Sequence, residues 1–109
     1  CNKFIEISEL IGNLTNLTYI SCSHNELTKL PDSLCSLTKL EVLDCSYNWS
    51  IRRLPELIGN LTNLSHMNCR GNCLDVLPDS LYTLTNLKTL YCRAVLKLPD
   101  SVIAYKDLD

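Results

Sequence analysis

The chain has 109 residues, of which 46% are hydrophobic, and its ten basic and twelve acidic residues give a net charge of −2. This length suits one domain. The near-neutral charge argues against nucleic acid and anionic membranes as partners, because both select basic proteins. No run approaches the roughly eighteen apolar residues that a transmembrane helix needs.

The sequence repeats itself with a period close to 23 residues. Copies open at Leu14, Leu37, Leu61 and Leu84, and Tyr105 stands where the next opening leucine is expected. Residues 1–13 align with the tail of an earlier copy. We therefore expect a single repeat domain over 1–109. It consists of a partial coil at 1–13, coils at 14–36, 37–60, 61–83 and 84–104, and the start of another coil at 105–109.

The first segment is predicted to be the end of a coil whose strand precedes it. Asn2 and Phe4 match an asparagine and a leucine that recur in later copies. The chain begins at Cys1, inside a repeat and without a methionine, which favours a piece of a longer protein. Because solenoid ends need a polar cover, we expect this coil to pack on residues outside the chain or to fray.

Each full copy begins with an alternating apolar segment. In the first, Ile20 and Cys22 alternate with polar neighbours over residues 18–23, the period-two pattern of a strand buried on one face. Asn25 follows, and then Leu27 and Leu30 carry the chain across the core.

The segment from Leu17 to Leu27 reads L-x-x-I-x-C-x-x-N-x-L, and the pattern returns in the following copies. It resembles the leucine-rich repeat family. The resemblance implies an α/β solenoid, a right-handed superhelix with short parallel strands on its concave face and short α or 3-10 turns on its convex face. It also implies that the recurring asparagines turn inward and bond to the backbone of adjacent coils. These are Asn2, Asn25, Asn48 and Asn72.

The second half of each copy is predicted to form an outer turn. Pro31, Pro55, Pro78 and Pro99 share one slot, where proline ends strand pairing and fixes φ. Asp32 and Ser33 are expected to cap the turn that follows. The segment is short, so it predicts one turn of α or 3-10 helix.

Two copies depart from the pattern. The second carries one extra residue near Trp49, the only tryptophan, which we expect to fold back over the asparagines; the alternative is an exposed contact residue. The fourth is two residues short and has Val95 in place of the asparagine. We expect Tyr105 and Leu108 to pack over that end.

Four of the seven cysteines follow the repeat and are predicted to be buried in the core. They stand in the second apolar position of each strand and are Cys22, Cys45, Cys69 and Cys92. A line of thiols on parallel strands suits neither tetrahedral zinc nor disulfides. Cys1, Cys35 and Cys73 lie off this line, and the latter two are expected to be at least partly exposed.

Two features of the sequence point to different cellular compartments. An odd number of cysteines without a cysteine-rich cap favours a reducing compartment. Five Asn-x-Ser/Thr triplets favour secretion, although the triplet at Asn48 is expected to be buried. We therefore expect a cytoplasmic protein, with secretion as the alternative.

The candidate site is the outward side of the strands, where residues vary between copies while the packing positions hardly vary. Tyrosine and arginine are common interface hot spots. Tyr91, Arg70 and Arg93 therefore predict contact with a protein or peptide that carries an acidic segment. The candidate partner-binding residues are Tyr19, Ser21, Ser23, Val42, Asp44, Ser46, Tyr47, His66, Asn68, Arg70, Thr89, Tyr91 and Arg93.

No catalytic constellation, cofactor motif or metal-ligand spacing is evident, since His24 and His66 have no acid or cysteine at a suitable spacing. The sequence thus predicts a non-enzymatic recognition module, of the kind found in signalling scaffolds and effector proteins. One alternative is the substrate-recruiting arm of a larger enzyme such as a kinase or ubiquitin ligase. The other is a thiol- or metal-binding protein. The oligomeric state is left open.

Overall fold

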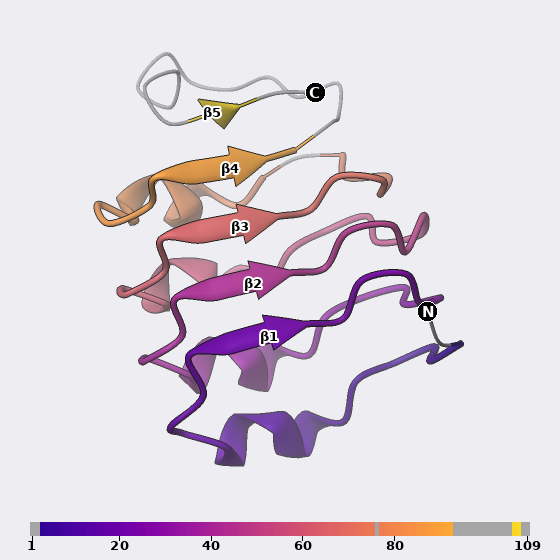
Figure 1. Cartoon of the computed structure of the whole chain (residues 1–109), viewed down its shortest axis with the longest axis horizontal. Coiled ribbons are helices and arrows are strands. Elements are labelled where there is room, and N and C mark those ends of the chain that lie inside the picture. Colours follow the sequence, from indigo (N-terminus) through magenta and orange to yellow (C-terminus); the bar gives the residue numbers. More distant parts are fainter. Residues whose placement is uncertain (1–2, 76, 93–105, 108–109) are drawn as a thin grey trace.

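The computed structural model describes residues 3–75, 77–92 and 106–107. Five short strands form one parallel sheet in chain order (Figure 1). The strands are β1 (Tyr19–Ser21), β2 (Val42–Asp44), β3 (His66–Asn68), β4 (Thr89–Tyr91) and β5 (Lys106–Asp107).

The register of the strands follows the repeat. Tyr19 pairs with Val42, Val42 with His66, and His66 with Thr89. Equivalent residues of successive copies are therefore neighbours, as the predicted parallel stacking requires. After β4 the spacing changes, because Leu90 pairs with Lys106 and only 16 residues separate them.

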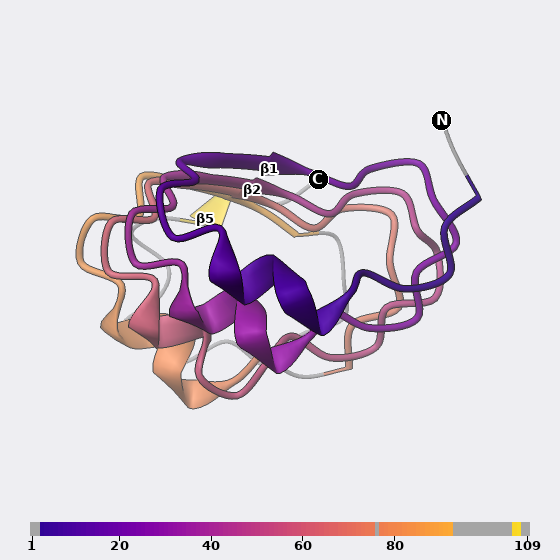
Figure 2. The ribbon, with the colours of Figure 1, turned by 90° about the horizontal axis from the view of Figure 1, so that it is seen from below.

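In the part of the chain that the structure describes, four 3-10 helices lie on the side opposite the sheet (Figure 2). Their hydrogen bonds join residues three apart, such as Leu34 N–H to the Pro31 carbonyl at 3.1 Å. The short outer turn expected from the sequence is thus confirmed as 3-10. The helices are η1 (Glu9–Asn13), η2 (Asp32–Ser36), η3 (Ile58–Asn60) and η4 (Asp79–Thr83).

Proline starts two of these turns, and the predicted side-chain caps are absent from them. Pro31 and Pro78 occupy the N-cap positions of η2 and η4 with φ of −70° and −66°, and neither helix start has a side-chain cap hydrogen bond. The expectation that Asp32 and Ser33 cap the turn is wrong, because both lie inside η2. Ser8 does cap η1, where its side chain accepts from Leu10 N–H at 3.1 Å.

The core is a continuous stack of leucines between the sheet and the 3-10 helices. Repeat positions one coil apart are buried together, as Leu37 and Leu61 are, and each coil covers the next. At the N-terminal end the equivalent Leu14 is 52% exposed and Phe4 is 62% exposed, since no described coil covers them. The fold therefore leaves an apolar end face at its first coil.

The asparagine ladder is present as the family resemblance implies. Asn48 is 2% exposed, and its Oδ1 accepts from Leu27 N–H at 3.1 Å. Its Nδ2 donates to the carbonyls of Cys22 and Cys45 at 3.2 and 2.9 Å. Asn25 Nδ2 donates to the Cys22 carbonyl and its Oδ1 accepts from Phe4 N–H. Asn72 makes only the donor half of the pattern, since its Nδ2 donates to the carbonyls of Cys45 and Cys69 while its Oδ1 has no partner among the described residues. The ladder pairs backbone groups that the turn would otherwise leave buried without partners.

One off-ladder cysteine contradicts its prediction. Cys35 is 5% exposed and therefore not at the surface. It shares its repeat position with Gly12 and Gly59, where an added Cβ would meet Ser33 and Ser80 of the next outer turn. In the first three outer turns this position thus lies against the next 3-10 helix and carries a small residue, whereas the fourth turn has Tyr82 there. Cys73 is exposed, as expected.

Several predicted features lie outside the described residues. These are the asparagine at Asn2, the proline slot at Pro99, the missing asparagine at Val95, the end-packing residues Tyr105 and Leu108, and the contact residue Arg93.

Candidate functional site

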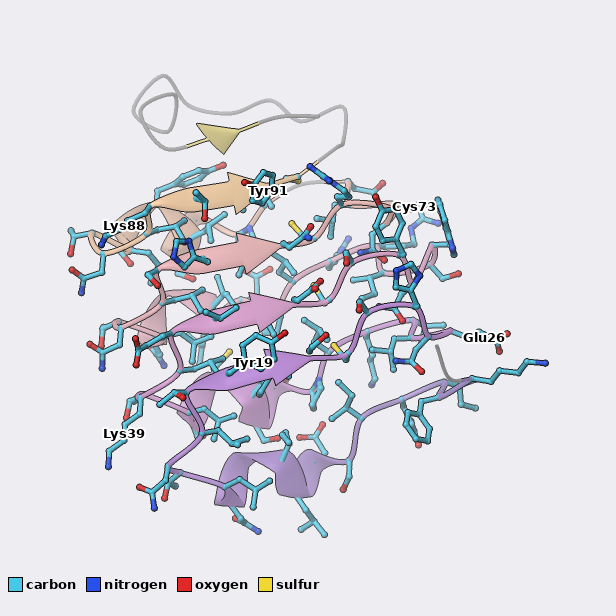
Figure 3. All side chains as sticks on the ribbon, viewed as in Figure 1. Tyr19, Glu26, Lys39, Cys73, Lys88 and Tyr91 are labelled. Carbon is cyan, nitrogen blue, oxygen red and sulfur yellow. The ribbon has the colours of Figure 1, made fainter. Side chains whose placement is uncertain are left out.

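The outward-pointing side chains of β1 to β4, with the residues that continue each strand, form what we call the strand face (Figure 3). Tyr19 of β1 is 59% exposed on this face, whereas Leu43 of β2 points to the opposite side of the sheet and is fully buried. The strand register places equivalent outward residues of successive strands next to one another, as predicted. The columns are Tyr19, Val42, His66 and Thr89, then Ser21, Asp44, Asn68 and Tyr91.

Polar side chains of the second column bond back to their own strand ends. Asp44 Oδ1 accepts from the backbone N–H and hydroxyl of Ser46 at 3.0 and 2.6 Å. Asn68 Oδ1 accepts from Arg70 N–H at 3.2 Å. These local bonds fix the backbone of the third-column residues Ser46 and Arg70. Ser46 is only 2% exposed, so it offers almost no surface to a partner. Ser23 is in the same column, with its hydroxyl 3.4 Å from that of Ser21.

Arg70 and Tyr91 contact each other on the strand face. The guanidinium carbon of Arg70 lies 4.9 Å from the centroid of the Tyr91 ring, within cation–π range. Both side chains are half-buried. In the first column His66 Nδ1 hydrogen-bonds to Thr89 Oγ1. Two of the three residues at the centre of the predicted contact are therefore together.

A second group of side chains, at the carboxyl ends of the strands, was only partly predicted. The rings of His24 and Tyr47 stack with centroids 5.0 Å apart, and Trp49 lies 5.6 Å from Tyr47. We call these three residues the aromatic rim. Trp49 is 65% exposed, so the prediction that it folds back over the asparagines is wrong.

The backbone explains why Trp49 stands out. The extra residue of the second coil is accommodated by a left-handed conformation, with Trp49 at φ 69°. His24 and Tyr47 are also left-handed, at φ 58° and 55°, and Gly71 takes this position in the third coil. Left-handed φ costs a non-glycine residue about 1 kcal/mol. In the sequence, the aromatic rim was indicated by His24 and Tyr47, which are ring residues at the same turn position of two successive coils.

Comparison with known proteins identifies the repeat. Residues 15–59 match the family model described as leucine rich repeats, in two copies. Residues 15–59 therefore contain leucine-rich repeats. The family resemblance and the solenoid fold expected from the sequence are both confirmed.

Solved leucine-rich repeat structures have the same fold. The leucine-rich repeat domain of the type III effector XopL superposes with a TM-score of 0.84 at 25% identity, over 96% of this chain and 40% of that one. The Leptospira interrogans LRR protein LIC12759 gives a TM-score of 0.63 at 24% identity, over 99% of this chain and 35% of that one. The chain thus spans less than half the length of either. A search of curated protein sequences found no match.

The four cysteines of the repeated strand segments behave as core residues. Cys22, Cys45, Cys69 and Cys92 are all buried, as predicted. Burial, followed by the charge of Asp44, raises the pKa of the Cys22 thiol to about 11. Burial also raises the pKa of Cys45 far above its usual range. A thiol that resists ionisation is a poor nucleophile and a poor metal ligand.

The described residues also lack a metal site and a membrane span. No group of three or more histidine, cysteine, aspartate or glutamate side chains in residues 3–75, 77–92 and 106–107 is placed to hold a metal ion. Within the same ranges, none of the helices has the length and apolar character needed to cross a membrane.

Thiol alkylation tests the burial of the cysteines. In the folded protein at about pH 8, iodoacetamide should modify Cys73 rapidly, because its thiol is exposed. Cys22, Cys35 and Cys45 should react slowly, since burial limits access and their raised pKa values leave little thiolate. Peptide mapping by mass spectrometry measures each site, with urea-unfolded protein as the control. Equal rates at Cys45 and Cys73 in the folded protein would contradict the buried arrangement.

Proposed function

We propose that the strand face binds a protein or peptide, and that the chain is a non-enzymatic recognition module of a longer protein. Leucine-rich repeat domains as a class use this face for protein binding. The observation that carries the proposal is the half-buried Arg70–Tyr91 pair on a face whose neighbouring positions hold exposed Tyr19 and His66. Arginine and tyrosine side chains of this kind dominate interface energies.

Charge favours an acidic partner segment at one end of this face. Arg70 and Lys88 belong to the third and fourth coils, whereas Glu41 and Asp44 belong to the second. An acidic segment near Arg70 and Tyr91 would form charge-assisted hydrogen bonds with the guanidinium. Asp44 is engaged by Ser46, so it contributes less than its charge alone suggests.

Charge reversal at Arg70 tests the proposal. Arg70→Glu should reduce capture of the partner by at least about tenfold, as expected for a central interface charge, with stability nearly unchanged. The measurement is a quantitative pull-down by the immobilised chain, followed by titration of the captured protein. Arg53→Glu is the matched control, because Arg53 is exposed and lies off the strand face.

The same experiment has two contradicting outcomes. Equal capture by wild type, Arg70→Glu and Arg53→Glu would place the contact elsewhere on the chain. A large loss of stability in Arg70→Glu, measured by thermal unfolding, would mean that Arg70 is structural.

A second candidate function is the substrate-recruiting arm of a larger enzyme. The observation behind it is that the chain covers only 40% of the solved leucine-rich repeat domain of a type III effector, so it corresponds to one part of a longer repeat domain. This candidate uses the same strand face. A catalytic domain in the flanking sequence of the full-length gene would distinguish it from a binding module without enzyme activity.

A further inference from the structure

A hollow of about 580 Å³ opens among the segments that lead from the strands to the 3-10 helices. These segments run down one side of the solenoid (Figure 2). We call this feature the basic hollow, and none of its lining residues belongs to the strand face. They come from three successive coils and are Thr28, Lys29, Ser50, Arg52, Arg53 and Asp75.

Positive charge gathers in the basic hollow, although the chain as a whole has a net charge of −2. Lys29, Arg52 and Arg53 carry three positive charges. Asp75 carries the one negative charge of the lining, which leaves a net charge of +2. The basic hollow therefore favours an anionic ligand, and a doubly charged anion balances its charge.

Arg52 is held in a fixed orientation at the basic hollow. Its Nε and Nη2 donate to Asp75 Oδ2 at 3.4 and 3.3 Å, and its carbonyl accepts from Asp75 N–H at 3.1 Å. A guanidinium has five N–H donors, and no described residue bonds to the Nη1 group of Arg52. Asp75 thus orients Arg52 and leaves donors for a ligand.

Lys29 and Arg53 keep charges that no described carboxylate neutralises. Within residues 3–75, 77–92 and 106–107, the structure shows an ion pair only between Arg52 and Asp75. Lys29 and Arg53 are both exposed, and each directly precedes the buried leucine and proline of its coil. Two like charges at the same position of adjacent coils repel each other, and an anion bound between them would remove that repulsion.

We propose that the basic hollow binds a phosphate dianion, carried by a phosphorylated side chain or present as free phosphate. A phosphate monoester has nearly two negative charges at pH 7 and three strong acceptor oxygens. Arg52 and Arg53 supply paired donors to these oxygens, and Lys29 supplies a point charge. A carboxylate has one charge and two oxygens, so it matches the lining less well. This site goes beyond the proposed function and does not depend on it.

NMR titration of the ¹⁵N-labelled 109-residue chain tests the site. N-acetyl-O-phosphoserine amide is added at about pH 7.5, where the phosphate is a dianion, and the backbone amides of residues 28–29 and 50–53 are followed. We expect saturable shifts, with binding about tenfold tighter than that of N-acetyl-aspartate amide. N-acetyl-serine amide should cause no saturable shift.

A parallel titration with sodium phosphate distinguishes the two sources of the dianion. Tighter binding of N-acetyl-O-phosphoserine amide than of inorganic phosphate would assign the site to a phosphorylated side chain. Tighter binding of inorganic phosphate would assign it to the free anion.

Two variants and a control locate the bound phosphate. Lys29→Gln and Arg53→Gln should each weaken binding of N-acetyl-O-phosphoserine amide about tenfold, through loss of a charge-assisted contact. Lys39→Gln is the matched control and should leave binding unchanged, because Lys39 lies at the opposite edge of the solenoid from Cys73 (Figure 3). All three positions are exposed, so the variants should remain folded, and the dispersion of their amide resonances verifies this.

Equal affinity for the phosphoserine and aspartate probes, or equal weakening by all three substitutions, would overturn the site, because either result describes general attraction to surface charge. The strand-face test fails or succeeds separately. Arg70→Glu, which should lose the partner, should still bind N-acetyl-O-phosphoserine amide, and loss of that binding would place the phosphate on the strand face instead.

Discussion

Leu43→Ala should lower the free energy of unfolding by about 3–4 kcal/mol, the range for a leucine that leaves a cavity in a close-packed core. Leu43 is fully buried at the centre of β2, between Ile20 of β1 and Met67 of β3. In a solenoid each coil is stabilised mainly by its neighbours. The cavity therefore weakens two coil interfaces, and little remains of a typical domain stability of about 5–15 kcal/mol.

The control for this variant is the preceding residue. Val42 points to the strand face and is half-buried, so Val42→Ala should cost about 1 kcal/mol or less. Urea unfolding followed by far-ultraviolet circular dichroism measures both. Similar losses in the two variants would contradict the in-and-out alternation that defines the strand face.

Asn48→Leu should lower the free energy of unfolding by about 2–3 kcal/mol through buried groups that lose their partners. The carbonyls of Cys22 and Cys45 also accept from Asn25 and Asn72, so each keeps one hydrogen bond. Leu27 N–H is different, because the structure gives it only Asn48 Oδ1 at 3.1 Å. This orphaned donor should account for most of the loss.

Asn63→Leu is the matched control for the asparagine ladder. Asn63 also donates to a carbonyl of the neighbouring coil, that of Thr38 at 2.8 Å, but the bond is exposed. Water replaces a lost partner there, so the cost should stay below about 0.5 kcal/mol. If urea unfolding showed the same free energy of unfolding for Asn48→Leu and the wild type, the asparagine ladder would not stabilise the fold.

The sequence was sufficient to predict the parts that repeat. Stacked coils must keep equivalent residues in register, so the columns from Tyr19 to Thr89 and from Ser21 to Tyr91 follow from counting residues. Burial of Cys45 and Asn48 follows for the same reason. Each of these positions has the same neighbours in every coil, and that regularity is visible in the chain.

The features that the sequence did not predict depend on contacts between particular coils. Cys35 is buried because outer turns stack on one another, which the pattern of a single coil does not reveal. Asp32 and Ser33 were expected to cap a turn that Pro31 starts instead. The contact between Arg70 and Tyr91 depends on the directions of two side chains from adjacent coils, which the repeat pattern does not specify.

Repeat spacing by itself determined the solenoid, its parallel sheet, its buried thiols and asparagines, and the row of outward-pointing side chains on the strand face. The tertiary structure alone decided how the irregular second coil presents its extra residue. Trp49 takes a left-handed φ, and Tyr47 is held between His24 and Gly71. The physical reason is that the repeat specifies which residues must share a core, whereas the direction of an inserted side chain depends on the local backbone and on the ring beside it.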